Sequence, residues 1–285
     1  MAYRRANSYL PIPARIIEVI VENSQIRTFV LAFVDEEYNR NFTHSPGQFM
    51  MVSVPHRGEA PISISSTPSR PGVIHLSVRR AGWLTTAMYE LAAGAVIGLR
   101  GPFGTSFPLE QLQGRDLLFV AGGIGLAPLR SVINFRLDQP DASGKVTVLY
   151  GSRTPADIAF RTDLDAWQNH PAVTCLLTVD ESQPGWTGPV GVVTTLLDQI
   201  ELDIPRTVAL LCGPPLMIRF VLAKLSRAGF DSRDIITTLE RHMKCGLGVC
   251  GHCHMDDKLI CVDGPVFSHA QLLEMEVAEL QIDRL

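Results

Sequence analysis

Short, β-branched apolar segments dominate the first hundred residues of the chain. They fall at residues 16–21, 28–34, 49–54, 62–65, 73–78 and 95–99, and turn residues separate them. Closely spaced strands of this kind are typical of an antiparallel sandwich or barrel. One helix is predicted within the series, at residues 84–91, and Gly94 suits its C-terminal cap.

From residue 116 onward, continuous apolar runs alternate with amphipathic segments. Strands are predicted at 116–121, 145–150, 173–179 and 207–212, and helices at 127–137, 162–170, 192–199 and 216–228. Unbroken apolar runs are expected of strands that are buried on both faces, and strand–helix alternation implies a parallel α/β sheet. The periodicity fades after about Ile235, where a cysteine-rich tail begins.

Composition excludes several classes of protein. Hydrophobic residues make up 46% of the chain and charged residues 19%, which is typical of a packed globular protein. The net charge of −4 disfavours a polycation that grips nucleic acid. No apolar run approaches the roughly 20 residues of a membrane span, and no apolar region follows the N-terminal arginines. We therefore expect a cytoplasmic protein with no nucleic-acid partner and no direct membrane insertion.

A glycine-rich turn joins the first strand of the α/β part to its helix. It reads Gly122-Gly123-Ile124-Gly125-Leu126-Ala127-Pro128. Glycines let the backbone approach a phosphate closely, and the helix N-terminus favours an anion. Pro128 lies where a first-turn proline is tolerated. The turn predicts dinucleotide binding, and a tight turn without a ligand is the alternative.

A second candidate phosphate site precedes the helix predicted at residues 84–91. Arg79 and Arg80 come just before Gly82, and Thr85 and Thr86 follow in the first turn. Cations and hydroxyls beside a helix N-terminus suit a diphosphate. Solvated arginines at an ordinary helix start are the alternative.

Three motifs in order resemble those of the ferredoxin–NADP reductase family. The glycine turn resembles its nucleotide-binding turn, and Cys212-Gly213-Pro214-Pro215 resembles its Cys-Gly-Pro segment beside the nicotinamide. The earlier segment resembles its flavin-binding Arg-x-Tyr-Ser-x-x-Ser signature, and it comprises Pro61, Ile62, Ser63, Ile64, Ser65 and Ser66. Gly101-Pro102-Phe103-Gly104 resembles the family segment that closes the flavin site, and a plain turn is its alternative.

The resemblance covers residues 10 to 230. It implies an FAD-binding antiparallel β-barrel domain followed by a parallel-sheet, Rossmann-like NAD(P)-binding domain, with Ser63 near the reactive edge of the flavin. Ser63 and Cys212 are therefore the candidate catalytic residues. Ala60 stands where the family usually has arginine, and Ile62 where an aromatic residue usually stacks on the flavin. The cradle of Arg79 and Arg80 is expected to supply the missing diphosphate contact.

Four cysteines cluster in the tail. Cys245, Cys250, Cys253 and Cys261 follow the spacing C-x4-C-x2-C-x7-C, whose first part matches plant-type [2Fe–2S] proteins. Gly246, Gly248 and Gly251 let backbone N–H groups face the sulfur atoms. Zinc and free thiols are the alternatives.

The tail from Arg241 to Phe267 resembles one branch of the same family, the flavin and iron–sulfur electron-transfer subunits of larger enzymes. The branch includes the gamma subunits of sulfhydrogenases, which are cytosolic NiFe hydrogenases, and the electron-transfer subunits of anaerobic sulfite reductase and of dihydroorotate dehydrogenase. The segment Gly58–Ser63 resembles both the sulfhydrogenase gamma subunits and the sulfite reductase subunit, and together with Tyr150–Pro155 it favours the sulfhydrogenase gamma subunits. The expected domains are thus residues 1–112 for FAD, 113–232 for NAD(P) and 233–285 for the cluster.

This resemblance implies a diaphorase-type subunit that passes electrons between NAD(P)H, FAD, a [2Fe–2S] cluster and partner subunits, expected to be hydrogenase subunits that include an iron–sulfur subunit. An electron-transfer subunit of anaerobic sulfite reductase or of dihydroorotate dehydrogenase is one alternative, and a stand-alone reductase is another. A zinc-containing nucleotide sensor is the alternative from a different class. Ser152 and Arg153 follow the second strand of the α/β part, near the expected ribose site. A hydroxyl and a cation there favour NADP(H) over NAD(H), unless Arg153 pairs with Asp157.

Overall fold

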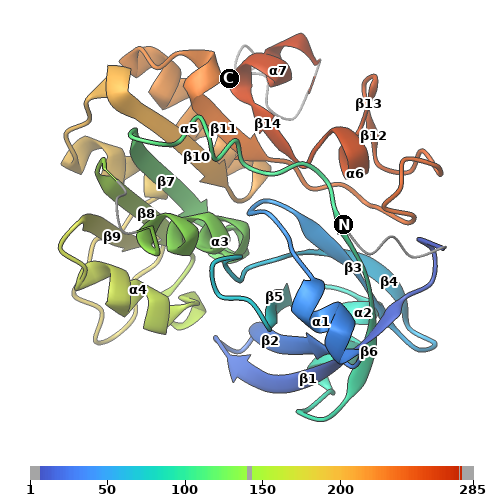
Figure 1. The fold of residues 1–285 in the computed structure, drawn as a ribbon. Coiled ribbons are helices and arrows are strands. Elements are labelled where there is room, and N and C mark those ends of the chain that lie inside the picture. The colour runs from blue at the N-terminus through green and yellow to red at the C-terminus, as the bar shows by residue number, and fades with distance from the viewer. Residues whose placement is uncertain (1–6, 140–142, 276, 278–285) are drawn as a thin grey trace.

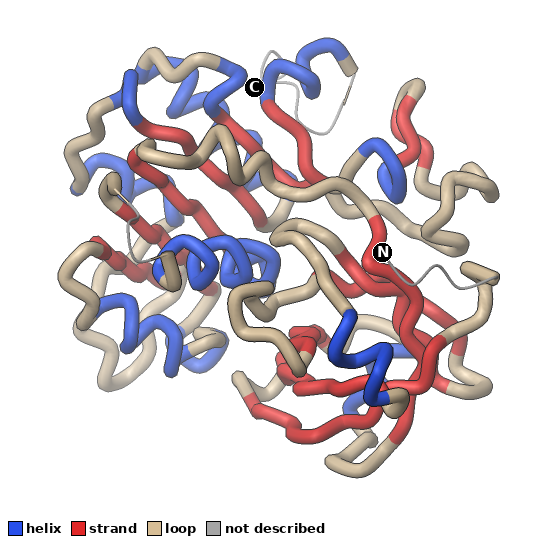
Figure 2. The backbone as a smooth tube through the Cα atoms, in the orientation of Figure 1, coloured by secondary structure: helices blue, strands red, loops and turns tan. Residues whose placement is uncertain are grey.

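The computed structural model describes residues 7–139, 143–275 and 277. Two six-stranded sheets organise this part of the chain, and the cysteine-rich tail lies beside both of them (Figure 1). The tube in Figure 2 separates the strands of the N-terminal barrel from those of the second sheet. The predicted fold class, a β-barrel followed by a parallel α/β domain and a small C-terminal segment, is confirmed.

The barrel is antiparallel throughout. Its strands run in the order β4-β3-β6-β1-β2-β5, and a bridge between Ile64 and Leu76 closes the ring. The strands are β1 (Ile12–Val21), β2 (Ile26–Phe33), β3 (Phe49–Val54), β4 (Gly58–Ser63), β5 (Ile74–Arg79) and β6 (Val96–Phe103). Burial alternates along the first half of β1, as expected of a strand with one face in a core. Helices α1 (Glu36–Asn41) and α2 (Trp83–Tyr89) complete the domain.

The second sheet has the order β14-β11-β10-β7-β8-β9. Its strands are β7 (Asp116–Gly122), β8 (Val146–Ser152), β9 (Val173–Val179), β10 (Thr207–Cys212), β11 (Ile235–Thr238) and β14 (Val266–Ser268). The first five are parallel, and β14 pairs antiparallel with β11. The α-helices α3 (Leu126–Leu137), α4 (Arg161–Gln168) and α5 (Pro215–Ala228) connect or follow these strands.

The tail continues the second sheet. The segment expected to begin at residue 233 supplies β11 and β14, and the cysteine loop lies between these two strands. Its small elements are β12 (His254–Met255), β13 (Lys258–Leu259), α6 (Ile260–Asp263) and α7 (His269–Glu274). Buried Cys253, Cys261 and Met243 share one core cluster with Phe49 and Met51 of the barrel.

Two predicted elements differ from the structure. The helix predicted at 192–199 is a 3-10 segment, Val193–Gln199, because β-branched residues at 192–195 disfavour an α-helix. The strand predicted at 62–65 is β4, which begins earlier at Gly58 and ends at Ser63. Its sequence, GEAPIS, lacks an apolar run and contains a proline. A proline is tolerated there because β4 ends the strand order.

No helix in the described residues has the length and apolar character needed to cross a membrane.

Candidate functional site

The glycine turn and the Cys-Gly-Pro segment meet at the carboxyl ends of β7 and β10. From β7 the sheet proceeds through β8 and β9 in one direction and through β10 and β11 in the other. Such a switch point is where open α/β sheets bind their ligands. A Cβ atom on Gly125 would lie 2.4 Å from the backbone oxygen of Cys212, so glycine allows the two turns to touch.

The four glycines of these turns differ in what surrounds them. Cβ atoms on Gly122 and Gly213 would each lie 2.5 Å from the side chain of Met217, which fills the gap between the turns. Gly123 has a φ of +55° and no atom within 4 Å of an added Cβ, so it faces open space. Of these glycines, Gly123 therefore leaves room for a ligand.

The other residues predicted on this side have different environments. Ala127 and Pro128 are buried in the first turn of α3, where they shape the turn. Pro214 is exposed in the Cys-Gly-Pro segment.

The thiol of Cys212 is buried at the end of β10. The hydroxyl of Thr238 donates a hydrogen bond to its Sγ atom at 2.8 Å. Burial raises the pKa of Cys212 to about 12, and the charge of nearby Glu240 acts in the same direction. The Cys212 side chain is therefore a neutral hydrogen-bonding group near neutral pH.

Thr238 and Glu240 were missed at the sequence level. The signal was present, because Ile235-Ile236-Thr237-Thr238 is a β-branched run. The same Glu240 interacts electrostatically with Arg79 at the end of β5. The segment that follows β11 thus brings a carboxylate close to both the Cys212 thiol and Arg79 of the predicted diphosphate cradle.

The flavin-like segment divides into two parts. Pro61, Ile62 and Ser63 lie on β4 and are partly exposed. The Ile64 side chain is fully buried in the barrel core, and the Ser65 hydroxyl pairs with that of Ser77 at 2.8 Å. We conclude that only the first three side chains are open to a ligand.

The second part of the segment holds the two domains together. The backbone oxygen of Ser66 accepts a hydrogen bond from the Ser131 hydroxyl at 2.6 Å, and that of Ser65 accepts one from Arg130 at 3.0 Å. Both donors lie on α3, the helix that follows the glycine turn. Arg130 also pairs with Asp163 at 2.8 Å and approaches His75 Nδ1 at 3.2 Å.

The predicted diphosphate cradle is only partly free. Arg79, Arg80, Gly82 and Thr86 are exposed. Thr85, in contrast, caps α2, because its Oγ1 atom accepts the backbone N–H groups of Ala81 and Gly82, both at 2.9 Å.

Two arginine side chains near the cradle lie close to one aromatic ring. The Arg80 guanidinium lies 5.6 Å from the centre of the Tyr89 ring, and that of Arg27 lies 4.5 Å from the same ring. Arg27 is a further cation on β2 that the sequence did not single out.

Arg153 points away from the partner that the sequence suggested. Its Nε atom lies 3.6 Å from Glu181 Oε1, whereas Asp157 accepts the hydroxyl of Thr154 at 2.7 Å. The Arg153 side chain is 76% exposed, so this ion pair is weak. Ser152, in contrast, is buried at the end of β8.

The cysteine loop brings its four thiols together. The Cys245 thiol interacts with that of Cys250, and the Cys261 thiol interacts with those of both Cys253 and Cys245. Within the residues that the structure describes, no three Cys, His, Asp or Glu side chains surround one point closely enough to hold a single metal ion. Cys250 is exposed and the other three are buried.

Backbone N–H groups face these sulfur atoms. Leu247 donates to Cys245 Sγ at 3.4 Å, and Gly248 donates to Cys261 Sγ at 3.2 Å. Burial opposes ionisation of Cys245, but the backbone N–H groups of Leu247, Val249 and Cys250 lower its pKa to about 6. Burial raises the pKa of Cys261 to about 12. Positive φ angles at Gly246 and Gly248, 72° and 74°, aim the loop amides inward.

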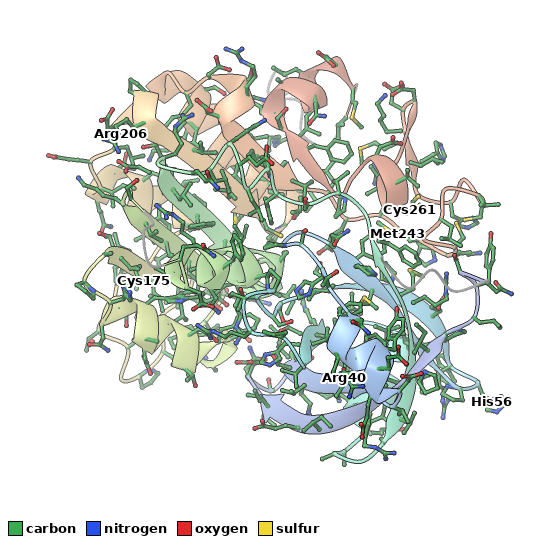
Figure 3. The ribbon with its side chains drawn as sticks, in the orientation of Figure 1. Arg40, His56, Cys175, Arg206, Met243 and Cys261 are labelled. Carbon is green, nitrogen blue, oxygen red and sulfur yellow. The ribbon has the colours of Figure 1, made fainter. Side chains whose placement is uncertain are left out.

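The loop is seated on the barrel. A Cβ atom on Gly246 would lie 3.0 Å from side-chain atoms of both Met51 and Phe103. Met51 belongs to β3, and β3 pairs with β4 in the register Met51–Pro61. One strand therefore separates the cysteine loop from the flavin-like segment. Figure 3 shows Met243 and Cys261 in the tail next to the barrel and Cys175 at the far side of the second sheet.

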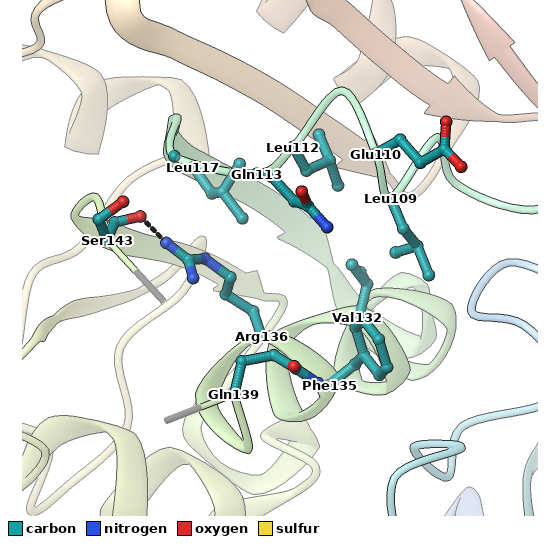
Figure 4. A pocket seen from close by; sticks show the side chains of 11 residues that line it. Leu109, Glu110, Leu112, Gln113, Leu117, Val132, Phe135, Arg136, Gln139 and Ser143 are labelled. Atoms are coloured by element: carbon teal, nitrogen blue, oxygen red, sulfur yellow. Dashed lines mark hydrogen bonds between the residues drawn. The ribbon is translucent and has the colours of Figure 1, made fainter. Parts of the chain in front are cut away.

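A cavity of about 550 Å³ lies away from both sites. Figure 4 shows its lining, which includes Leu117 at the amino end of β7 and Arg136 near the end of α3. The glycine turn is at the opposite end of β7. Cavity volume alone therefore does not mark the chemistry of this protein.

Comparison with protein families gives two matches. Residues 119–223 match the oxidoreductase NAD-binding domain, and residues 240–273 match the iron–sulfur cluster binding domain of dihydroorotate dehydrogenase B. The first contains the glycine turn and the Cys-Gly-Pro segment, and the second contains all four clustered cysteines.

Curated relatives match along almost their whole length. The gamma subunit of sulfhydrogenase 2 from Pyrococcus furiosus is 39% identical over 279 residues, covering 92% of this chain and 96% of the relative. A probable dihydroorotate dehydrogenase B (NAD(+)) electron transfer subunit from Methanocaldococcus jannaschii is 33% identical, with 90% and 89% covered. Among solved structures, an NADH-dependent reduced ferredoxin–NADP oxidoreductase has a TM-score of 0.74 at 22% identity, with 99% and 95% covered.

Proposed function

The chain belongs to the iron–sulfur electron-transfer subunits of the ferredoxin–NADP reductase family, and from this premise we propose that it carries electrons between NAD(P)H, FAD, a [2Fe–2S] cluster and a partner subunit. When bound, FAD accepts a hydride as an electron pair and can release its electrons singly to an iron–sulfur cluster. The seating of the cysteine loop on β3, next to the flavin-like strand β4, is the observation that carries this proposal.

The arrangement of the thiols favours a two-iron cluster over zinc. A zinc ion needs four ligands around one point, whereas each iron of a [2Fe–2S] cluster takes two cysteines. The interactions of Cys245 with Cys250 and of Cys253 with Cys261 fit the second requirement, and the interaction of Cys261 with Cys245 brings the two pairs side by side. The inward N–H groups of Leu247 and Gly248 suit sulfur atoms that carry negative charge.

The remaining roles belong to residues near the glycine turn, in the flavin-like segment and in the diphosphate cradle. Gly123 leaves room for the dinucleotide at the start of α3, and Ser63, at the end of β4, would lie near the flavin's reactive edge. The buried Cys212 thiol, oriented by Thr238, would keep the turn beside the nicotinamide neutral. Arg79 and Arg80 neutralise the diphosphate, with Gly82 and Thr86 beside them. No acid–base constellation is required, because these side chains position the reactants.

The partner that we propose is a NiFe hydrogenase assembly with its own iron–sulfur subunit. The similarity to gamma subunits of sulfhydrogenases 1 and 2 supports it, with 34% and 39% identity. The similarity to electron transfer subunits of dihydroorotate dehydrogenase supports a second candidate partner at 33% identity. Val249 is 70% exposed beside the exposed thiol of Cys250, so the outer edge of the loop is open to a partner.

Cofactor analysis of the native protein tests the cofactor part of this proposal. We expect one FAD, two iron atoms and two sulfide ions per chain, with flavin and iron–sulfur bands in the visible spectrum. Zinc without colour would instead favour the nucleotide sensor. FMN alone would contradict the FAD assignment.

Purification of the native complex tests the partner. We expect this chain to elute with hydrogenase subunits and to reduce NADP⁺ with electrons from H₂. Co-elution with a dihydroorotate dehydrogenase would select the second candidate, and elution alone with full reductase activity would select the stand-alone enzyme.

A further inference from the structure

A buried ion pair connects the flavin-like strand to the cysteine loop. The guanidinium of Arg100, on β6, is only 4% exposed. Its Nε atom donates to Glu59 Oε1 at 2.9 Å, and its Nη2 atom donates to Glu59 Oε2. Glu59 lies on β4, two residues before Pro61. The ion pair therefore connects β6 to β4, the strand that contains the start of the flavin-like segment.

The other side of the same guanidinium holds the first cysteine of the loop. The Nη1 atom of Arg100 donates to the backbone oxygen of Cys245 at 2.9 Å and to that of Ser8 at 3.2 Å. The rings of Phe103 and Tyr9 lie 5.6 Å and 6.0 Å from its central carbon. Arg100 is thus held on all sides, with hydrogen bonds to both redox segments.

Stability alone gives a poor reason for this arrangement. Removing two charges from water is costly, and well-packed apolar residues often stabilise a protein as much as a buried ion pair does. Apolar residues cannot, however, supply an electric field. In this pair the positive end contacts the cysteine loop and the negative end lies on β4, so the pair has a fixed direction relative to the two sites.

The direction of this field determines its effect. A reduced cluster carries one more negative charge than an oxidised one, and a nearby cation in a water-poor site stabilises that charge. Charge and hydrogen bonding around a cluster are established controls of its potential. The field of Arg100 therefore acts on a one-electron step in which the cluster gains the electron that the flavin loses, and no covalent bond forms or breaks.

We propose that Arg100, oriented by Glu59, is a positioning residue that fixes the Cys245 segment and raises the reduction potential of the cluster. This inference rests on the proposed function, because it requires a cluster in the loop and a flavin beside β4. It also assigns a role to Glu59, which belongs to the segment singled out in the sequence.

Redox titration of the holoprotein, followed by the electron paramagnetic resonance signal of the reduced cluster, tests the proposal. We expect Arg100→Gln to shift the ratio of reduced to oxidised cluster about tenfold toward oxidised at a fixed potential, which equals about 59 mV for a one-electron couple. Glu59→Gln removes the opposing charge, so its shift should have the opposite sign. Arg100→Lys keeps the cation and should retain most of the wild-type potential.

Opposite signs separate a field effect from simple loosening. If Arg100→Gln and Glu59→Gln both move the potential in the same direction, or neither moves it, the proposal is wrong. Arg115→Gln provides a matched control, because it removes an arginine from the Arg115–Asp234 ion pair outside both sites, and its cluster potential should be that of the wild type. If Arg100→Gln does not fold, Glu59→Gln and Arg100→Lys still decide the question.

The same titration keeps the two proposals apart. A wild-type protein without a [2Fe–2S] signal would overturn the proposed function itself. A wild-type protein with the signal, and variants with unchanged potentials, would overturn only the role of Arg100.

Discussion

The four cysteines between residues 245 and 261 meet within one loop, whereas the crevice that we propose for the dinucleotide combines residues 122–125, 212–214 and Thr238 from the ends of β7, β10 and β11. The loop depends on local glycines with positive φ, such as Gly246 and Gly248. The crevice depends on strand order and on backbone contacts between distant turns. A local change should therefore abolish the first site alone, and a packing change should damage the second.

Loss of one ligand should have the largest effect and should stay within the loop. We expect Cys250→Ala to lose the cluster completely, because one iron would lack a ligand, while FAD remains bound. Iron, sulfide and flavin analysis of the purified variant measures this. The control is Cys175→Ala, which removes a buried thiol from β9 and should keep full iron content. Full iron content in Cys250→Ala would show that Cys250 is not a ligand of the cluster.

A single methyl group in the crevice should produce the next largest effect. An alanine at position 125 would press against backbone atoms of Cys212 and Gly213, which cannot move aside as a side chain can. We expect Gly125→Ala to lower the free energy of unfolding by about 3 kcal/mol and to slow flavin reduction by nicotinamide. Thermal unfolding and stopped-flow reduction measure the two effects.

Gly123→Ala is the matched variant. Its methyl group meets no atom within 4 Å, and its φ of +55° should cost about 1 kcal/mol. Equal losses in the two variants would show that backbone strain, not contact between the turns, governs the crevice.

Nicotinamide selection should depend on Arg153. We expect Arg153→Ala to raise KM for NADPH roughly 10- to 100-fold and KM for NADH far less, because a charge-assisted contact with the 2′-phosphate is lost. Steady-state kinetics with both cofactors measures the ratio. Glu181→Gln frees Arg153 from its 3.6 Å partner and should leave KM for NADPH unchanged or lower. Equal changes for the two cofactors in Arg153→Ala would exclude a role in reading the phosphate.

Acid should weaken the domain junction behind the crevice by the smallest amount. Burial and the charge of Arg130 lower the pKa of His75 to about 4. Between pH 6.5 and 4 the unfolded chain binds a proton that the folded chain does not, so stability present above pH 6.5 is lost as the pH falls. For this half-buried side chain we expect a loss of about 1 to 2 kcal/mol.

Denaturant unfolding at pH 7.5 and pH 5 measures this loss. His75→Gln should reduce the difference in the free energy of unfolding between the two pH values. Part of the difference should remain, because burial also lowers the pKa values of His44 and His269. The iron content of the loop should be the same at both pH values. If the difference between the two pH values is unchanged in His75→Gln, the junction does not depend on this side chain.

Much of the architecture follows from the amino-acid sequence because the relevant signals are local. The apolar runs of β7, β8 and β10 identify buried strands, and the β-rich segments before residue 104 identify the barrel. The run of β9 also identifies a strand, but β9 lies at the edge of the sheet and is only partly buried. The spacing of the cysteines identifies their loop, since residues this close in sequence need only suitable turns to meet. The turn after β7 likewise identifies itself by its glycines.

Tertiary structure decides which of these segments face one another. The β-branched run of β11 does not show which strand it will join, yet β11 brings Thr238 to Cys212 across 26 residues. The order of barrel strands brings Arg100 to Cys245 across 145 residues, and the end of β9 brings Glu181 to Arg153. Sequence spacing determines contacts only within a turn or loop. Contacts between distant residues depend on strand order and on the burial of whole faces, which no single segment encodes.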